Sequence, residues 1–252
     1  MFEQIFLPIL LSFLAGISTL VGGLIAFFIK KFKTSYLSLI LGFSVGVMIF
    51  ISFVEFLMTS IKNIGFLYAN VGFFVGIITI YLIDLLIPHI YEEEKTVREG
   101  SKLKRIGILI ALGIAIHNIP EGIAVSFSSI SSIKVGILVA VAIALHNIPE
   151  GIAVSAPIYY ATKSKRTALW YSFLSGIVEP IGAILALLLF YPFINGFNLN
   201  FMFAVVAGIM VFISFDELLP TCFRYKNFHL SILGLFIGMF LMSMSLYFFG
   251  LM

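Results

Sequence analysis

The sequence predicts an all-α integral membrane protein with eight transmembrane helices. Of its 252 residues, 61% are hydrophobic and only 11% are charged, which is too apolar a balance for a water-soluble domain. Short polar breaks separate hydrophobic runs of bilayer length, since a membrane-spanning helix needs about 20 residues. The runs cover residues 5–29, 36–59, 66–88, 106–128, 133–160, 167–191, 199–222 and 229–251. We therefore expect a single transmembrane domain over residues 1–252.

The first run is expected to stay in the chain as a membrane span. It follows Met1, Phe2 and Glu3 instead of a basic flank, and it lacks a small-residue cleavage pattern. These are not the features of a removable signal peptide.

Lysine and arginine are divided unevenly between the two sides of the expected spans. The breaks after the first, third, fifth and seventh runs hold thirteen of the fifteen basic residues: Lys30, Lys31, Lys33, Lys95, Arg98, Lys102, Lys104, Arg105, Lys163, Lys165, Arg166, Arg224 and Lys226. The opposite side has only Lys62 and Lys134. Because cytoplasmic loops are enriched in basic residues, we expect a multi-pass protein of the plasma membrane with both termini outside the cytoplasm. We attribute the pI near 8.9 to loops that face anionic membrane lipid, and expect no nucleic-acid partner.

One hexapeptide, His-Asn-Ile-Pro-Glu-Gly, occurs twice. The stretch "AIHNIPEGIAVS" begins at Ala115 and "ALHNIPEGIAVS" at Ala144, so eleven of twelve positions recur after 29 residues. Two longer similarities surround it: "FLAGISTLVGG" from Phe13 resembles "FLSGIVEPIGA" from Phe173, and "GVMIFISFVEFL" from Gly46 resembles "GIMVFISFDELL" from Gly208.

These similarities predict an inverted repeat. Spans 1–3 match spans 6–8, and matching spans lie an odd number apart, so they must cross the membrane in opposite directions. The expected arrangement is 3+2+3, with the two hexapeptides on the central fourth and fifth spans. Inverted repeats with a substrate site near the midplane are typical of secondary transporters.

The hexapeptide places a compact group of nitrogen and oxygen atoms on each central helix. Residues four apart share a helix face, so we expect His117 to pair with Glu121, and His146 with Glu150. Asn118 and Asn147 lie three residues before those carboxylates.

The proline and glycine of the hexapeptide predict an opened backbone and a close helix contact. Pro120 frees the carbonyl of Ile116, and Pro149 that of Leu145, with a kink in each helix. Gly122 and Gly151 allow neighbouring helices to approach closely.

Seven acidic residues lie inside the expected spans, whereas no lysine or arginine lies well inside one. They are Glu55, Asp84, Glu121, Glu150, Glu179, Asp216 and Glu217. A charge at the centre of a bilayer costs about 2.5–3.5 kcal/mol on insertion scales, so these groups must be protonated, hydrogen-bonded or bound to a cation. His, Glu and Asn side chains suit a borderline divalent metal such as zinc, with iron and manganese also accommodated.

The paired hexapeptides, the eight spans, the external termini and "SGIVEP" resemble the ZIP (ZRT/IRT-like protein) family of metal transporters, especially its broad-specificity bacterial zinc-uptake branch. The resemblance covers essentially the whole chain. It implies uptake of Zn²⁺ into the cytoplasm, with Fe²⁺, Mn²⁺ and Cd²⁺ as further substrates and no resident cofactor. It also implies a midplane two-metal site on spans 4, 5 and 6, formed by His117, Glu121, His146 and Glu150, with Asn118, Asn147 and Glu179 in the neighbouring position.

Two features differ from other members of that family. The break after the third span lacks a histidine-rich stretch, and Asn147 and Glu150 occupy places where other branches have Glu and His. A homodimer is one assembly that the resemblance leaves open.

Two other functions remain open from the residues alone. Paired His and Glu could activate a zinc-bound water in a membrane metalloenzyme, but the sequence has no HExxH motif and no phosphate-binding glycine loop. The carboxylates could instead relay protons in a carrier of another solute. We expect a transporter and no enzymatic activity.

Overall fold

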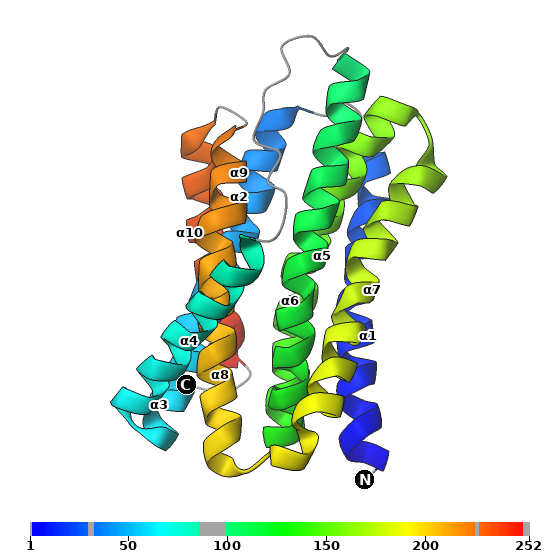
Figure 1. Ribbon diagram of the computed structural model, residues 1–252. Helices are drawn as coiled ribbons and strands as arrows, with labels where there is room; N and C mark the ends of the chain where they lie inside the picture. The colour runs from blue at the N-terminus through cyan, green and yellow to red at the C-terminus, as the bar shows by residue number, and fades with distance from the viewer. Residues whose placement is uncertain (1, 30–32, 86–98, 225–226, 249–252) are drawn as a thin grey trace.

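The computed structural model describes residues 2–29, 33–85, 99–224 and 227–248, and within these ranges all of its regular secondary structure is helical (Figure 1). The α-helices are α1 (Phe2–Ile25), α2 (Thr34–Ile51), α3 (Met58–Ile64), α4 (Phe66–Asp84), α5 (Glu99–Ser131), α6 (Ile133–Thr162), α7 (Lys165–Phe190), α8 (Gly196–Ile213), α9 (Leu219–Arg224) and α10 (Phe228–Phe248). Short 3₁₀ segments, η1 (Ala26–Phe28) and η3 (Tyr191–Phe193), follow α1 and α7.

The expectation of eight spans is confirmed. The described residues contain eight helical segments long and apolar enough to cross a membrane: Ile5–Phe28, Ser35–Ile64, Phe66–Asp84, Gly107–Ser131, Ile133–Thr162, Lys165–Phe193, Gly196–Phe223 and Phe228–Phe248. The ends of the third and eighth expected runs, residues 86–88 and 249–251, lie outside the described residues. So do five of the basic residues in the breaks, namely Lys30, Lys31, Lys95, Arg98 and Lys226.

Helix α5 begins at Glu99, earlier than the expected 106. The added residues, "EGSKLKR", include Glu, Leu, Lys and Arg, which are good helix formers in water. The hydrophobic run therefore predicts the membrane-spanning part of α5 but not its polar extension.

The second and seventh spans each contain a π-helical segment that the sequence analysis did not predict. Segment η2 (Ser52–Leu57) joins α2 to α3, and η4 (Ser214–Leu218) joins α8 to α9. In η2 the Ser52 hydroxyl donates to the Met48 carbonyl at 2.7 Å, and in η4 the Ser214 hydroxyl donates to the Met210 carbonyl at 2.8 Å. A π turn inserts an extra residue into a helix and is frequently found at functional sites.

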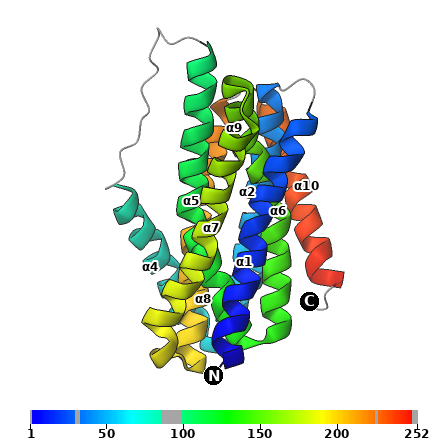
Figure 2. The same ribbon diagram turned by 90° about the vertical axis from the view of Figure 1, so that its right-hand side faces the viewer.

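The helices pack as two groups around α5 and α6. Helix α1 contacts α6 and α7, and α5 contacts α6 and α7, whereas α2 packs on α10 and α4 on α8. Contacts of α2 with α6 and of α5 with α8 join the groups. Figure 1 shows α5 and α6 between the two groups, and Figure 2 shows α1 beside α7.

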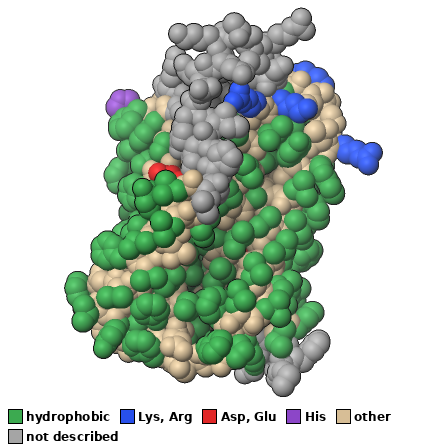
Figure 3. Space-filling model, viewed as in Figure 1, with side chains coloured by type: hydrophobic (Ala, Val, Ile, Leu, Met, Phe, Trp, Pro, Cys, Tyr) green, Lys and Arg blue, Asp and Glu red, His purple; other side chains and the backbone are tan. Residues whose placement is uncertain are grey.

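The surface has the division expected of a membrane protein. In the view of Figure 3, hydrophobic side chains cover the middle of the molecule, and the Lys and Arg side chains in view gather near one end. Large apolar side chains are strongly exposed on the outer helices, for example Phe74 of α4 and Phe240 of α10. These faces are suited to contact lipid rather than water.

Our first prediction concerns the contact between α2 and α10. A Cβ added at Gly46 would lie 2.0 Å from the Leu235 carbonyl oxygen, so Gly46→Ala must push the two backbones apart. We expect a loss of about 1–3 kcal/mol in unfolding free energy, the usual cost of overpacking. Gly196→Ala adds the same methyl group where no atom lies within 4 Å, and should leave stability unchanged. Thermal unfolding of both purified variants tests this, and equal melting temperatures would contradict it.

Candidate metal centre

The two hexapeptides meet at the contact between α5 and α6. His117 and Glu121 lie on α5, and His146 and Glu150 lie on α6, all with fully buried side chains. Both helices run without a break through their prolines, Pro120 in α5 and Pro149 in α6.

The histidines and glutamates pair between the helices, and this corrects the expectation of pairs within each helix. Nε2 of His117 lies 3.2 Å from Oε2 of Glu150, and Nε2 of His146 lies 2.8 Å from Oε1 of Glu121. Identical motifs on two adjacent helices that run in opposite directions place each imidazole opposite the other helix's carboxylate. Spacing of four residues puts a His and a Glu on one helix face, but it does not select the partner.

The imidazole of His146 has both nitrogens engaged. Its Nδ1 lies 3.2 Å from the Ala142 carbonyl oxygen, and its Nε2 lies 2.8 Å from Oε1 of Glu121. A metal ion bound at Nε2 would therefore have to replace the contact with Glu121.

The asparagines tie the centre to α1 and α7. Nδ2 of Asn147 donates to Oε2 of Glu179 at 2.8 Å and to the Ala15 carbonyl at 3.1 Å. Nδ2 of Asn118 donates to the Ser175 carbonyl at 2.8 Å. Glu179 thus lies beside Asn147, whereas Asn118 contacts α7 one turn before Glu179.

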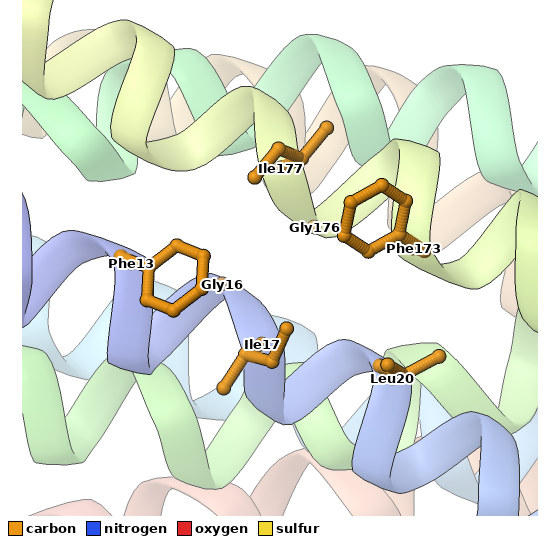
Figure 4. A pocket seen from close by; sticks show the side chains of 7 residues that line it. All are labelled: Phe13, Gly16, Ile17, Leu20, Phe173, Gly176 and Ile177. Atoms are coloured by element: carbon orange, nitrogen blue, oxygen red, sulfur yellow. The ribbon is translucent and has the colours of Figure 1, made fainter.

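Helix α1 takes part in the centre although the sequence analysis assigned it no site residue. Ala15 and Ser175 precede Gly16 and Gly176, where α1 and α7 touch: a Cβ at Gly16 would lie 2.3 Å from the Gly176 carbonyl oxygen. Figure 4 shows this contact, flanked by apolar side chains such as Phe13 and Phe173. In the sequence, the resemblance of "FLAGI" in α1 to "FLSGI" in α7 was the signal that could have indicated this contact.

The glycines of the hexapeptides bring backbones together, as expected. A Cβ at Gly122 would lie 1.9 Å from the Glu179 carbonyl oxygen, and one at Gly151 would lie 1.8 Å from that of Thr19. Helices α5 and α6 therefore press directly on the backbones of α7 and α1. The contact at Gly122 therefore fixes how close the backbone of α7 at Glu179 lies to α5.

Six polar atoms of the centre are buried without a hydrogen-bond partner. They are Nδ1 of His117, Oδ1 of Asn118, Oε2 of Glu121, Oδ1 of Asn147, Oε1 of Glu150 and Oε1 of Glu179. Buried polar atoms are nearly always satisfied, so a cluster of unpaired ones requires an explanation. Five are lone-pair oxygens, which suit a cation.

The histidines and carboxylates are not yet arranged around a common point. Within the described residues, no three His, Cys, Asp or Glu side chains form a ready set of metal ligands. The two Nε2 atoms face carboxylates instead. A metal ion would have to open at least one of the pairs.

Three acids lie outside the centre in the π segments. Glu55 of η2 is half-buried, as are Asp216 and Glu217 of η4. Glu217 reaches toward α5, where a Cβ at Gly113 would lie 3.4 Å from its Oε2. Gly113 is one helical turn before His117, so Glu217 approaches the same face of α5.

The fold and this centre define a class: a multi-pass α-helical membrane protein with a buried histidine–carboxylate centre between its helices. Comparison with known proteins identifies the family. A profile described as "ZIP Zinc transporter" matches residues 93–246. The chain belongs to the ZIP zinc transporter family.

Curated relatives extend the match to nearly the full length. The zinc transporter ZupT of Campylobacter jejuni is 47% identical, with 97% of each chain covered. That of Lysinibacillus sphaericus is 49% identical over 94% of this chain and 95% of its own. That of Chlorobium phaeovibrioides is 46% identical over 97% and 98%. These relatives are named transporters, which points to a transporter rather than an enzyme.

Our second prediction concerns the crossed pairs. Replacing one partner, as in Glu121→Leu or His146→Leu, should lower the unfolding free energy by about 3–5 kcal/mol, because the remaining polar group is buried without its partner. Replacing both should cost much less than the sum. Thermal unfolding of the three variants in excess chelator tests the coupling between the side chains, and additive losses would contradict the pairing.

Proposed function

We propose that this protein transports zinc across the membrane into the cytoplasm through the centre between α5, α6 and α7. The observation that carries the proposal is the set of six unpaired polar atoms around the two buried His–Glu pairs. Lysine and arginine are absent from the described contacts of this centre, so its carboxylates have no basic neighbour other than the histidines. The names of the relatives support zinc as the substrate.

The chemistry of the donors supports a borderline divalent ion. Imidazole nitrogen and carboxylate oxygen are common zinc ligands, and the same set suits Fe²⁺ and Mn²⁺. The centre has no thiolate, since the chain's single cysteine, Cys222, lies on α9. We infer that Fe²⁺, Mn²⁺ and Cd²⁺ compete with Zn²⁺ for the same path.

The seven residues divide into two neighbouring positions for metal. We assign His117, Glu121, His146 and Glu150 to the main position, because their side chains already contact one another in pairs. We assign Asn118, Asn147 and Glu179 to the second, because Asn147 contacts Glu179 at 2.8 Å. The free oxygens of Glu121 and Glu150 are available to bridge the two ions.

We also propose the 3+2+3 inverted repeat as the architecture around this site. Equivalent contacts in the two halves support it. Asn118 donates to the Ser175 carbonyl and Asn147 to that of Ala15. The two asparagines are repeat equivalents 29 residues apart, and the two acceptors are repeat equivalents 160 residues apart. The packing of α2 on α10 has its counterpart in the packing of α8 on α4.

Our third prediction tests the centre by transport. His117→Ala or Glu150→Ala removes a metal ligand, so zinc uptake should fall by more than the roughly 10- to 100-fold that loss of an outer-shell group costs a metal site. His229→Ala changes an exposed histidine on α10 and should transport normally. Uptake of labelled zinc into proteoliposomes, with Fe²⁺, Mn²⁺ and Cd²⁺ as competitors, measures both activity and selectivity. Normal uptake by both centre variants would overturn the proposal.

Our fourth prediction concerns orientation, which follows from the uneven distribution of basic residues. In a Cys222→Ser background, Lys33→Cys should react in intact cells only with a membrane-permeant thiol reagent. Lys134→Cys and Gly196→Cys should react with an impermeant reagent added outside. The opposite pattern would reverse the orientation and the direction of transport.

A further inference from the structure

We propose that the basic end of the molecule where α1, α6 and α7 meet is a binding site for the headgroup of an anionic phospholipid. We call this site the α1–α6–α7 corner and define it by Phe27, Tyr160, Lys163, Lys165 and Arg166. It is separate from the metal centre and does not depend on the zinc proposal.

The corner is built from three chain segments that are joined to one another. Tyr160 near the end of α6 donates its hydroxyl to the Ile29 carbonyl, 2.5 Å away, just after η1. Phe27 of η1 packs edge-on against Tyr159, with ring centroids 5.0 Å apart. Only residues 163 and 164 separate α6 from α7, so the start of α7 is held beside the end of α1.

The turn between α6 and α7 holds Lys163 in an uncommon conformation. Its φ of 55° makes it the one non-glycine residue with positive φ among the described residues, and such a conformation costs about 1–2 kcal/mol. The backbone N–H of Lys163 donates to the Tyr159 carbonyl at 2.8 Å. Ser164 then caps α7 by accepting from the Thr167 N–H at 3.2 Å.

Two lysines of the corner are positioned over aromatic rings. Nζ of Lys163 lies 5.2 Å from the centroid of the Tyr160 ring, and Nζ of Lys165 lies 5.3 Å from that of Phe27. Cation–π contacts of this kind restrict flexible side chains. The ammonium groups are therefore partly ordered before any ligand arrives.

The positive charges of the corner face solvent. Lys163, Lys165 and Arg166 are exposed, and none of the three takes part in an ion pair among the described residues. Three exposed cations on one corner suit a phosphate ester, to which lysine and arginine make charge-assisted hydrogen bonds.

Exposed aromatic side chains next to these cations favour a lipid over a free phosphate. Phe28 is 84% exposed and Trp170 is 57% exposed. Trp170 lies four residues after Arg166, so the two share a face of α7. Tryptophan is enriched at the headgroup level of membranes. A phospholipid would place its phosphate among the cations and its acyl chains along Phe28 and Trp170.

The test measures lipid selectivity of the purified full chain in a neutral detergent. Phosphatidylglycerol and phosphatidylcholine with the same acyl chains are titrated together, and native mass spectrometry quantifies each bound lipid. Lys163→Gln with Lys165→Gln should lower the preference for phosphatidylglycerol by about fivefold for each lysine removed. The matched control, Lys62→Gln with Lys134→Gln, removes two exposed lysines outside the corner, one on α3 and one at the start of α6, and should keep the wild-type preference.

A second variant distinguishes lipid binding at an ordered site from attraction of lipid by diffuse positive charge. Phe27→Leu keeps every charge but removes the ring under Lys165, and should give a preference between the wild type and the double lysine variant. An unchanged preference in Phe27→Leu would contradict an ordered site. So would equal losses in the corner and control pairs, or a wild-type protein that binds the two lipids equally.

Discussion

The structure depends on the burial of four carboxyl and imidazole groups between helices that are apolar enough to span a membrane. Because a lone charge there is costly, each carboxylate needs a partner, and the partner is an imidazole on the neighbouring helix. This requirement holds α5 against α6 in one register. The asparagines then join α6 to α1 and α5 to α7, and the glycines let the backbones come close enough for those bonds to form. The packing of four helices thus follows from satisfying one polar cluster.

If zinc passes through this cluster, as we propose, the same pairs explain how the site could bind an ion and still release it. The Nε2 atom of each histidine lies against a carboxylate, so a cation bound there would gain new ligands but would have to open at least one His–Glu pair. The net gain is smaller than the sum of the new bonds. In the proposed function, the pairs that stabilise the protein without metal would therefore also limit how tightly it holds zinc.

Much of this could be predicted from the sequence, for physical reasons that are visible in particular residues. Long apolar runs predict spans because the bilayer requires a minimum length. The doubled hexapeptide indicates the candidate ligand residues because polar groups are costly inside those runs. Spacing could not predict that His117 pairs with Glu150, since that depends on how two helices pack. Ala15 was missed because it contributes a carbonyl, which every residue has. The polar start of α5 was missed because a search for apolar runs does not detect a helical segment made of polar residues.

The two π segments bear on how the chain arose. Segments η2 and η4 begin at Ser52 and Ser214, each with a methionine carbonyl four residues earlier as the acceptor of the serine hydroxyl. An extra residue in a helix shifts every residue after it. Two independent insertions at matching places would therefore each have required their own compensating changes in packing. If the chain is built from the inverted repeat that we propose, a single insertion in an ancestral half, followed by gene duplication, would account for both. In that case the π turn would be older than the eight-span protein. The sequences around it would have diverged, to Val54 in one half and Asp216 in the other, without loss of the turn.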